Sequence, residues 1–372
     1  MSRLASRIEL FARAATARLQ RRRPPASPRR ILIAHHLLLG DTIMLTPLLA
    51  KLREQYPQAQ LVMTVAEPLA PLYAARPFGV DVLPFDLRSR KSLKPLYRAG
   101  PFDLALVPGD NRYSWLALAM RARWIVAFAG DRPAYKSWPV DELIAYPDVP
   151  AAWGDMVAGL LEGPAPRSFD SSDWPAPPHK QFDLPQEPYA VLHVGASSPL
   201  KRWQPARWAA LAETFNANGI VPVWSAGRTE IGELVEADPQ SRYPRFAGNL
   251  DLAQLWHLLR HARVLVCPDT GIAHLGRITG TPTVALFGPG SHIVSGAGDY
   301  WRDSPFRAVS VDPFACRDQR MLFKRELAWV RRCGRSTEEC GAPECMRAIG
   351  LDDVQKAIAQ LLPFNPLTTQ TK

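Results

Sequence analysis

Short apolar segments alternate with amphipathic ones along most of the chain. From residue 30 the apolar runs RRILIAHH, QLVMTVAE, DVLPFD, FDLALVPG and RWIVAFAG appear, and IMLTPLLAKLREQYP has the spacing of a helix. The alternation restarts with YAVLHVGASS and continues through IVPVWSAG, YPRFAGN, RVLVCPD and TPTVALFG, separated by helical patterns such as QPARWAALAETFNANG and DLAQLWHLLRHA. It predicts two doubly wound α/β domains, each with a parallel sheet covered by helices.

A proline-rich segment separates the two series of strands. Residues 147 to 188 supply many of the 36 Pro of the chain, which is typical of an interdomain linker. We therefore expect an N-terminal arm over 1–27 and a first domain over 28–185 that ends in this linker. A second domain over 186–348 and a C-terminal helix and tail over 349–372 complete the predicted organisation.

The positive charge of the chain is concentrated at its start. Residues 1–30 hold nine Arg and one Glu, a net +8 out of +10 for the whole chain, so the other 342 residues carry only +2. A nucleic-acid-binding surface on the folded domains is therefore not favoured. Apolar residues in the arm form one helical stripe between arginines: Leu4, Ile8, Phe11, Ala15 and Leu19. The arm is interpreted as a helix on an anionic membrane surface, a poorly ordered leader or an organellar transit peptide.

The composition also bears on the compartment. Nowhere do about 18 apolar residues follow one another, so no membrane-spanning helix is predicted. Five Cys in a chain of this length do not indicate a secreted disulfide framework. We expect a cytoplasmic protein, peripheral on a membrane if the arm binds lipid.

Candidate chemistry follows the predicted strands, because doubly wound domains bind ligands outside the carboxyl ends of their strands. Gly40 and Asp41 follow the first strand, and Asp41 is either a helix N-cap or a general base. Ser197, Ser198 and Lys201 follow the first strand of the second domain. Hydroxyls and a cation in such a loop suit a diphosphate, and a solvated loop is the alternative.

Two further turns of the second domain follow the same rule. Glu230 ends WSAGRTE and either accepts hydrogen bonds from a ribose or favours the N-terminus of the next helix. Asp269, Thr270 and Gly271 stand where a strand meets a helix, and His274 lies in the first turn of that helix. The free N–H groups there suit a phosphate, whereas His274 alone would be a structural histidine. Neither G-x-G-x-x-G nor the Lys-Ser/Thr of a P-loop is present.

Four segments together resemble glycosyltransferase family nine, the lipopolysaccharide heptosyltransferase family. They are GDTIMLTPLLAKL, HVGASSPLKRW, GRTE and PDTGIAHLGRITGTPTVALFGPGS, and the resemblance runs in order from about residue 30 to 360. It implies a GT-B fold, with two Rossmann-like domains whose parallel sheets face across a cleft. The first domain would bind the acceptor and the second the nucleotide-sugar, and the segment 350–362 would form a helix that crosses back to the first domain.

The resemblance also implies an activity, namely inverting transfer of heptose from ADP-heptose to a lipopolysaccharide core hydroxyl, with no metal or other cofactor. The sequence has no D-x-D triplet. Asp41 would be the catalytic base, and Lys201 would stabilise the leaving group. The implied nucleotide-sugar contacts are Ser197, Ser198, Lys201, Glu230, Asp269, Thr270, Gly271 and His274. Arg277 departs from the pattern, which leads us to expect a small residue there, and its bulk would change either packing or donor choice.

Basic residues after the third strand are candidates for the acceptor site. The segment DLRSRKSLKPLYRAG holds Arg88, Arg90, Lys91, Lys94 and Arg98. They suit a phosphorylated acceptor such as the lipopolysaccharide inner core, or they form a solvated basic loop.

Four cysteines cluster near the C-terminus, in the segment 316–345. Cys316, Cys333, Cys340 and Cys345 are separated by 16, 6 and 4 residues, without a C-x-x-C pair. They either bind a structural zinc or remain thiols. The resemblance adds iron as a candidate, because some family members that modify autotransporter adhesins carry a cysteine-bound iron. Cys267 lies in a predicted strand and is expected in the core.

Three other functions are compatible with these patterns. A nucleotide-sugar 2-epimerase shares the two-domain architecture but would bind a uridine nucleotide and need no acceptor. A heptosyltransferase could act on a protein acceptor, such as an autotransporter, instead of a lipid. A non-catalytic scaffold at the membrane would keep the fold without turnover.

Overall fold

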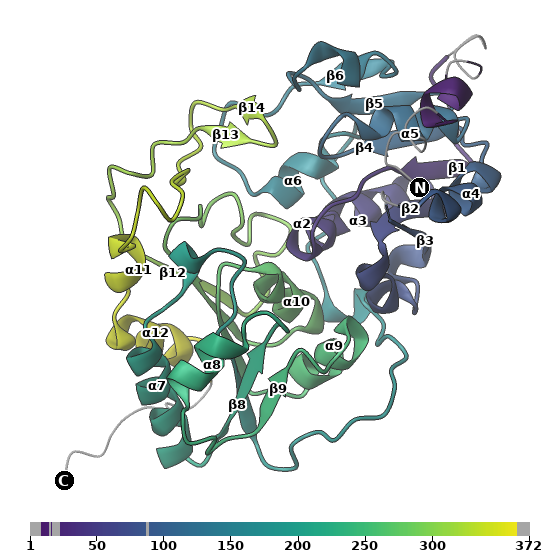
Figure 1. Cartoon of the computed structure of the whole chain (residues 1–372). Helices are drawn as coiled ribbons and strands as arrows, with labels where there is room; N and C mark the ends of the chain where they lie inside the picture. The colour runs from purple at the N-terminus through teal and green to yellow at the C-terminus, as the bar shows by residue number, and fades with distance from the viewer. Residues whose placement is uncertain (1–8, 15, 17–22, 87–88, 363–372) are drawn as a thin grey trace. The chain divides into compact units, whose positions relative to one another are not determined.

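The computed structural model describes residues 9–14, 16, 23–86 and 89–362 (Figure 1). The chain divides into two compact units. The first unit contains Met1–Ser168 and Met321–Trp329, and the second contains Phe169–Arg320 and Val330–Lys372. The main division falls inside the proline-rich segment, after Ser168, where the sequence leads us to expect it at 185.

The first unit is built on a six-stranded parallel sheet in the order β3-β2-β1-β4-β5-β6. Its strands are β1 (Arg30–Ile33), β2 (Gln60–Ala66), β3 (Val80–Phe85), β4 (Leu104–Val107), β5 (Ile125–Phe128) and β6 (Glu142–Ile144). The first five match the apolar runs of the sequence. The edge strand β6 was not predicted, because three residues of mixed polarity and partial exposure give no clear period.

Helices and 3-10 turns connect these strands. They are α2 (Leu39–Ile43), α3 (Thr46–Gln55), η1 (Glu67–Tyr73), η2 (Pro77–Gly79), α4 (Arg90–Ala99), α5 (Tyr113–Ala119), η3 (Ala134–Ser137) and α6 (Trp153–Ala158). Buried apolar residues of α4 and α5 pack with β1, β4 and β5 in one hydrophobic core cluster. The strands β1, β4 and β5 therefore share one packed core with α4 and α5.

Part of the N-terminal arm packs on this unit. Residues 9–14 are helical, and Leu10 and Ala14 contact the core cluster of α4 and α5. The Phe11 ring meets the ring of Trp115 edge-on, with centroids 4.8 Å apart. The other members of the predicted apolar stripe, namely Leu4, Ile8, Ala15 and Leu19, lie outside the described residues.

The second unit has its own six-stranded parallel sheet, in the order β12-β11-β10-β7-β8-β9. Its strands are β7 (Tyr189–His193), β8 (Val221–Ala226), β9 (Arg245–Ala247), β10 (Val264–Pro268), β11 (Thr283–Phe287) and β12 (Phe306–Ser310). β12 was not predicted. Its sequence FRAVS neither alternates regularly nor forms a continuous apolar run, and most of its residues are partly or fully exposed at the edge of the sheet.

The helices and 3-10 turns of the second unit are η4 (Ser171–Asp173), η5 (Pro199–Lys201), α7 (Pro205–Ala217), α8 (Ile231–Ala237), α9 (Leu252–Arg260), α10 (Gly271–Thr279), α11 (Glu344–Arg347) and α12 (Leu351–Ala359). The predicted N-cap of α9 is confirmed, because the Asp251 carboxylate accepts the Gln254 N–H at 2.9 Å in a capping box. α12 packs against α7, β11 and β12. The division of the chain thus assigns α12 to the second unit, whereas the resemblance implies a helix that crosses to the first.

A two-stranded antiparallel hairpin interrupts the second unit in sequence but belongs to the first. It consists of β13 (Met321–Leu322) and β14 (Arg325–Glu326). Phe323 and Lys324 form its turn, with φ of +45° and +66°. In the described parts of the chain, no helix is long and apolar enough to cross a membrane.

Candidate functional site

The carboxyl edge of the second sheet brings two of the predicted residues together. Lys201 ends η5, in the turn that follows β7, and Asp269 directly follows the neighbouring strand β10. The Lys201 Nζ donates to Asp269 Oδ2 and to the Asp269 main-chain oxygen, both at 2.8 Å. The lysine side chain keeps 26% of its surface exposed and the aspartate 10%. A partly accessible cation is thereby fixed at the edge where ligands bind in this class of sheet.

The N-terminus of α10 lies immediately after this contact. Thr270 is its N-cap, and its hydroxyl accepts the Ile272 N–H at 3.4 Å. Gly271 is the first helical residue, so the first turn of α10 offers N–H groups that have no partner within the helix. An anion is stabilised at such a terminus by these N–H groups and by the helix dipole.

His274 occupies the first turn of α10 and is buried. Burial lowers the pKa of His274 well below its ordinary value, and the positive charges of Arg277 and Lys201 lower it further. The imidazole is therefore neutral at physiological pH. Its electrostatic interaction with Lys201 links it to the Lys201–Asp269 contact.

Arg277, the departure from the family pattern, is 1% exposed. Its guanidinium donates to the main-chain oxygens of Ser295 at 2.7 Å and Gly296 at 2.9 Å, and it lies 3.8 Å from the centre of the Phe306 ring. The bulk of this arginine is therefore accommodated by packing within the second unit.

Glu230 stands at the N-cap position of α8, but its side chain does not cap that helix. The Oε2 atom instead accepts the Gly227 N–H at 2.8 Å. A Cβ atom on Gly195 would lie 1.8 Å from the same oxygen, so glycine is required there for the carboxylate to take this place. The turns after β7 and β8 thus meet at Glu230.

The hydroxyls of the loop after β7 have different surroundings. Ser197 is exposed, and Ser198 is the N-cap of η5, where its Oγ accepts the Leu200 N–H at 3.3 Å. As the N-cap, Ser198 stabilises the short turn in which Lys201 lies. Its O–H remains a donor.

Two features of this edge were missed at the level of sequence. His193 and Ser225 end paired strands, and the His193 Nδ1 lies 3.0 Å from the Ser225 Oγ. Burial lowers the pKa of His193 to about 4. A Cβ on Gly290 would lie 2.1 Å from Asp269 Oδ2, so the turn after β11 also closes on the site. The glycines in HVGASS and FGPGS were the available signal.

In the first unit, Asp41 lies inside α2, in its first turn, and is partly buried. Leu38 holds the N-cap position, so the interpretation of Asp41 as an N-cap is wrong. The Asp41 carboxylate is close enough to Tyr146 to affect that phenol. Burial is the main cause that raises the pKa of Tyr146 to about 12, and the charge of Asp41 adds to it.

A buried ionic network occupies the turns after β4 and β5 in the same unit. The Asp131 side chain is fully buried, and its Oδ1 lies 3.0 Å from the Lys136 Nζ. Its Oδ2 accepts the Asn111 N–H at 2.7 Å. Lys136 also contacts Asp110 at 3.0 Å. Every charge in this group faces an opposite one, which buried ions require.

The hairpin contributes one more charge to this network. The Arg325 side chain is 3% exposed and lies 3.8 Å from Asp131. Its guanidinium donates to Asn111 Oδ1 at 2.7 Å and to the main-chain oxygens of Gly109 at 3.0 Å and Ala129 at 2.8 Å. This arginine joins the turns after β4 and β5. Nothing local in the sequence marks this arginine, which lies about 200 positions from its partners, so it was not predicted.

The basic residues proposed for an acceptor are only partly described. Arg88 lies outside the described residues, and Arg90 begins α4 with no description of its side chain. Lys91, Lys94 and Arg98 are exposed along α4, at a spacing that places them on one face of the helix. The opposite face is buried in the core cluster.

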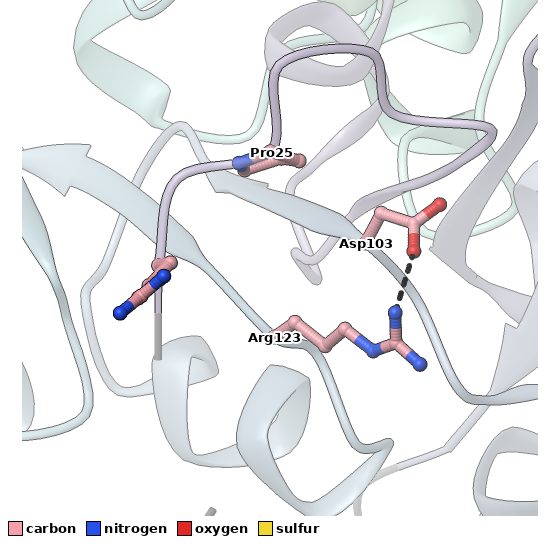
Figure 2. Close-up of a pocket in the computed structure, with 4 residues that line it drawn as sticks. Pro25, Asp103 and Arg123 are labelled. Atoms are coloured by element: carbon pink, nitrogen blue, oxygen red, sulfur yellow. Dashed lines mark ion pairs between the residues drawn. The ribbon is translucent and has the colours of Figure 1, made fainter. Parts of the chain in front are cut away.

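The first unit also has a cavity of about 480 Å³ that none of the predicted site residues lines (Figure 2). It is lined by Arg23, Pro25, Asp103 and Arg123, with Arg123 and Asp103 paired at 3.5 Å. Asp103 precedes β4, so this cavity sits at the amino ends of the strands, opposite the edge that holds Asp41. A second cavity, of about 320 Å³, is lined by the last residues of β5 and β6 and by residues between β6 and the end of α6.

The cysteines do not form a metal site within the ranges that the structure describes, where no group of three or more His, Cys, Asp or Glu is arranged to hold an ion. Of the two alternatives for Cys316, Cys333, Cys340 and Cys345, the structure therefore does not support the metal site, and none of the four takes part in a disulfide. Burial and the neighbouring thiol of Cys333 raise the pKa of Cys316. Cys267 is buried in β10, as predicted.

Comparisons with known proteins agree with this geometry. Residues 91–302 match the family model of glycosyltransferase family 9 (heptosyltransferase). The chain is 28% identical over 295 residues to lipopolysaccharide heptosyltransferase 1 of Pseudomonas aeruginosa, covering 72% of this chain and 81% of that protein. It is 22% identical over 295 residues to lipopolysaccharide heptosyltransferase 3 of Escherichia coli, covering 71% and 83%.

Solved structures show the same fold. The structure of the E. coli ADP-heptose lipopolysaccharide heptosyltransferase II aligns with a TM-score of 0.65 at 18% identity, over 89% of this chain and 99% of that one. The two parallel six-stranded sheets with their helices are therefore a GT-B fold, as the sequence predicted.

Proposed function

We propose, from the premise that this chain belongs to glycosyltransferase family 9, the heptosyltransferase family, that it transfers heptose from ADP-heptose to a hydroxyl of a lipopolysaccharide core acceptor. The transfer inverts the anomeric centre and uses no metal ion. The observation that supports it best is the Lys201–Asp269 contact beside the N-terminus of α10. Family membership favours a transferase over the 2-epimerase, and a measured transfer activity would distinguish it from a non-catalytic scaffold.

The second unit would hold the donor. Its diphosphate would lie against Lys201 and the first N–H groups of α10, near Thr270 and Gly271, while Glu230 would accept hydrogen bonds from the ribose. As the glycosidic bond breaks, negative charge grows on the departing diphosphate. A cation and a helix N-terminus stabilise that charge in the way a metal ion does in other transferases.

The first unit would supply the base. Asp41 would take the proton of the acceptor hydroxyl as that oxygen attacks the anomeric carbon through an oxocarbenium-like transition state. A positioned carboxylate in this role typically accelerates transfer about 10²- to 10⁴-fold. The exposed cations of α4 would contact acidic groups of the acceptor.

The enzyme would act at the cytoplasmic face of the inner membrane, where its proposed acceptor lies, and the basic N-terminal arm supports this proposal. The net +8 of residues 1–30 attracts anionic lipid by roughly 1 kcal/mol for each basic residue near the surface. Sedimentation with anionic vesicles tests this placement. Removal of residues 1–27 should release the protein, and equal binding without them would contradict a membrane role of the arm.

The central test is a transfer assay with ADP-heptose and lipopolysaccharide that lacks core heptose, read as ADP release and as product mass. Asp41→Ala should lower turnover at least about 100-fold, while ADP affinity stays unchanged because the proposed donor site lies in the other unit. Asp148→Ala, an exposed aspartate of the same unit, is the matched control. Turnover of Asp41→Ala within tenfold of the parent would exclude it as the base.

Two further experiments test the identity of the nucleotide and of the acceptor. The thermal shift given by ADP should exceed those given by UDP, GDP and dTDP, and no response to ADP would refute the donor. An autotransporter passenger domain replaces the lipid in a parallel reaction. Sugar transfer to that protein and not to the lipopolysaccharide would replace the proposed acceptor with a protein.

A further inference from the structure

Arg277 and His274 make a direct contact on consecutive turns of α10. The Arg277 Nη1 lies 3.2 Å from the His274 Nδ1. A guanidinium has N–H donors and no acceptor, so it donates here and the Nδ1 atom accepts. A nitrogen that accepts this bond carries no proton. In a neutral ring the proton must then lie on Nε2.

We propose that Arg277 is a positioning residue that holds His274 as the neutral Nε2–H tautomer, so that the ring offers one fixed N–H donor to the diphosphate of the donor sugar. This inference rests on the proposed function for the identity of the ligand. The tautomer itself is a property of the protein alone.

Arg277 is well fixed for this task. Its bonds to the main-chain oxygens of Ser295 and Gly296 and its stacking on Phe306 leave the guanidinium little freedom to rotate. The arginine therefore also ties the loop after β11 to α10. One buried side chain sets both the state of the histidine and the place of that loop.

The charges around the ring favour the same state. Lys201 and Arg277 are the cations that act on His274, and burial disfavours a charged imidazole further. Asp269 is engaged with Lys201. A neutral N–H donor adds a hydrogen bond to the diphosphate without a second full charge beside Lys201, so product ADP is held less tightly than by two cations.

The first experiment is nitrogen-15 NMR of the histidine side chains in the full-length protein without ligand. Comparison of the parent with His274→Gln identifies the His274 signals among the eight histidines. We expect a neutral ring with the proton on Nε2 that does not titrate between pH 8 and 5.5. A proton on Nδ1, or a charged ring in this range, would overturn the proposal.

Arg277→Met tests the cause. Without the donor at Nδ1, the Nδ1–H tautomer should become populated, whereas a purely structural arginine would leave the tautomer unchanged. Arg277→Lys retains the charge and an N–H donor and should restore the Nε2–H form in part. If Arg277→Met does not fold, the spectra of the parent still decide the tautomer.

Two substitutions of His274 test which ring nitrogen binds the diphosphate. Their affinity for ADP-heptose is measured by calorimetric titration. Its phosphates are both esterified and do not titrate near neutral pH. His274→Gln places an amide N–H near the Nε2 position and should bind ADP-heptose within about threefold of the parent. His274→Asn can still accept from Arg277 but lacks that donor, and it should bind about tenfold more weakly, as for one hydrogen bond to a charged group.

Equal binding by the Gln and Asn variants would overturn the assignment of Nε2 as the donor. Failure of the parent itself to bind ADP-heptose would instead refute the proposed function. The NMR result would still decide the state of His274 in that case, so the two failures are distinguishable.

Discussion

Replacement of Lys201 by alanine gives the most direct measure of how a metal-free site handles the leaving diphosphate. The change removes the amine that lies 2.8 Å from Asp269 Oδ2 and leaves that carboxylate, 10% exposed, without its cation. Loss of one preorganised donor to charge that grows in the transition state costs about 10²- to 10³-fold in kcat.

A second effect acts on binding. Two like charges about 4 Å apart repel by roughly 4 kcal/mol at an effective dielectric constant near 20, and less where solvent screens them. The Asp269 carboxylate therefore repels the diphosphate once Lys201 is gone. The double variant Lys201→Ala/Asp269→Asn should bind ADP-heptose more tightly than the single variant, by about tenfold after screening, while its kcat stays low.

The assay is single-turnover transfer at saturating donor, with ADP-heptose affinity measured by calorimetry. Arg202→Ala is the matched control, because this neighbouring cation pairs with Glu233 of α8 and its own side chain is 42% exposed. Its kcat and its affinity for ADP-heptose should stay within about twofold of the parent, because a guanidinium that solvent screens contributes little. A parent-like rate for Lys201→Ala at saturating donor would show that Lys201 does not act on the leaving group. Equal affinities of the single and double variants would refute the repulsion by Asp269.

Three further predictions concern residues of the first unit. Arg325→Met should lower the free energy of unfolding of this unit by about 3 to 5 kcal/mol, because it breaks a buried pair. Arg123→Met, at an arginine of the same unit whose side chain is 66% exposed, should cost less than about 1 kcal/mol; equal losses in hydrogen exchange of the two variants would refute the difference. Burial opposes ionisation of Asp110, but its hydrogen bonds to Arg112 and Lys136 lower its pKa to about 2, below its ordinary value, so it stabilises the fold above pH 4 and this contribution is lost as the pH falls to about 2. In chemical denaturation, Asp110→Asn should therefore be less stable than the parent at pH 7, and most of this difference should be gone at about pH 2; a difference that keeps its neutral-pH size would contradict the assignment. Charge reversal at Lys91 and Lys94 should raise the KM for a phosphorylated acceptor several-fold and leave the donor KM unchanged, and an unchanged acceptor KM would favour a solvated basic face.

The sequence predicted the strands and the turns that follow them because both signals are local. Buried parallel strands are continuous apolar runs, and polar residues such as Asp269 directly after a run mark its carboxyl end. The meeting of Lys201 with Asp269 then follows from the adjacency of β7 and β10 in the sheet. That order is itself the usual one for a doubly wound fold.

The parts that were missed depend on distant partners. Arg277 seemed only a bulky departure, because its role is set by Ser295, Gly296 and Phe306, which lie 18 to 29 positions further along the chain. Arg325 carries no local mark of burial, since an arginine in a short two-stranded hairpin is usually solvated. Such residues are recognised only when the charges and carbonyls that enclose them are seen in space.

The hairpin of residues 321–329 means that the first unit is not encoded in one piece. A gene fragment that ends at the linker would produce a sheet whose Asp131 and Asn111 lack the guanidinium that the intact chain supplies from far downstream. Domain dissection of this enzyme therefore requires complementation, in which a peptide spanning the hairpin is added to the N-terminal fragment. For the same reason, the ribosome must synthesise most of the second unit before Arg325 can pair with Asp131 in the first unit.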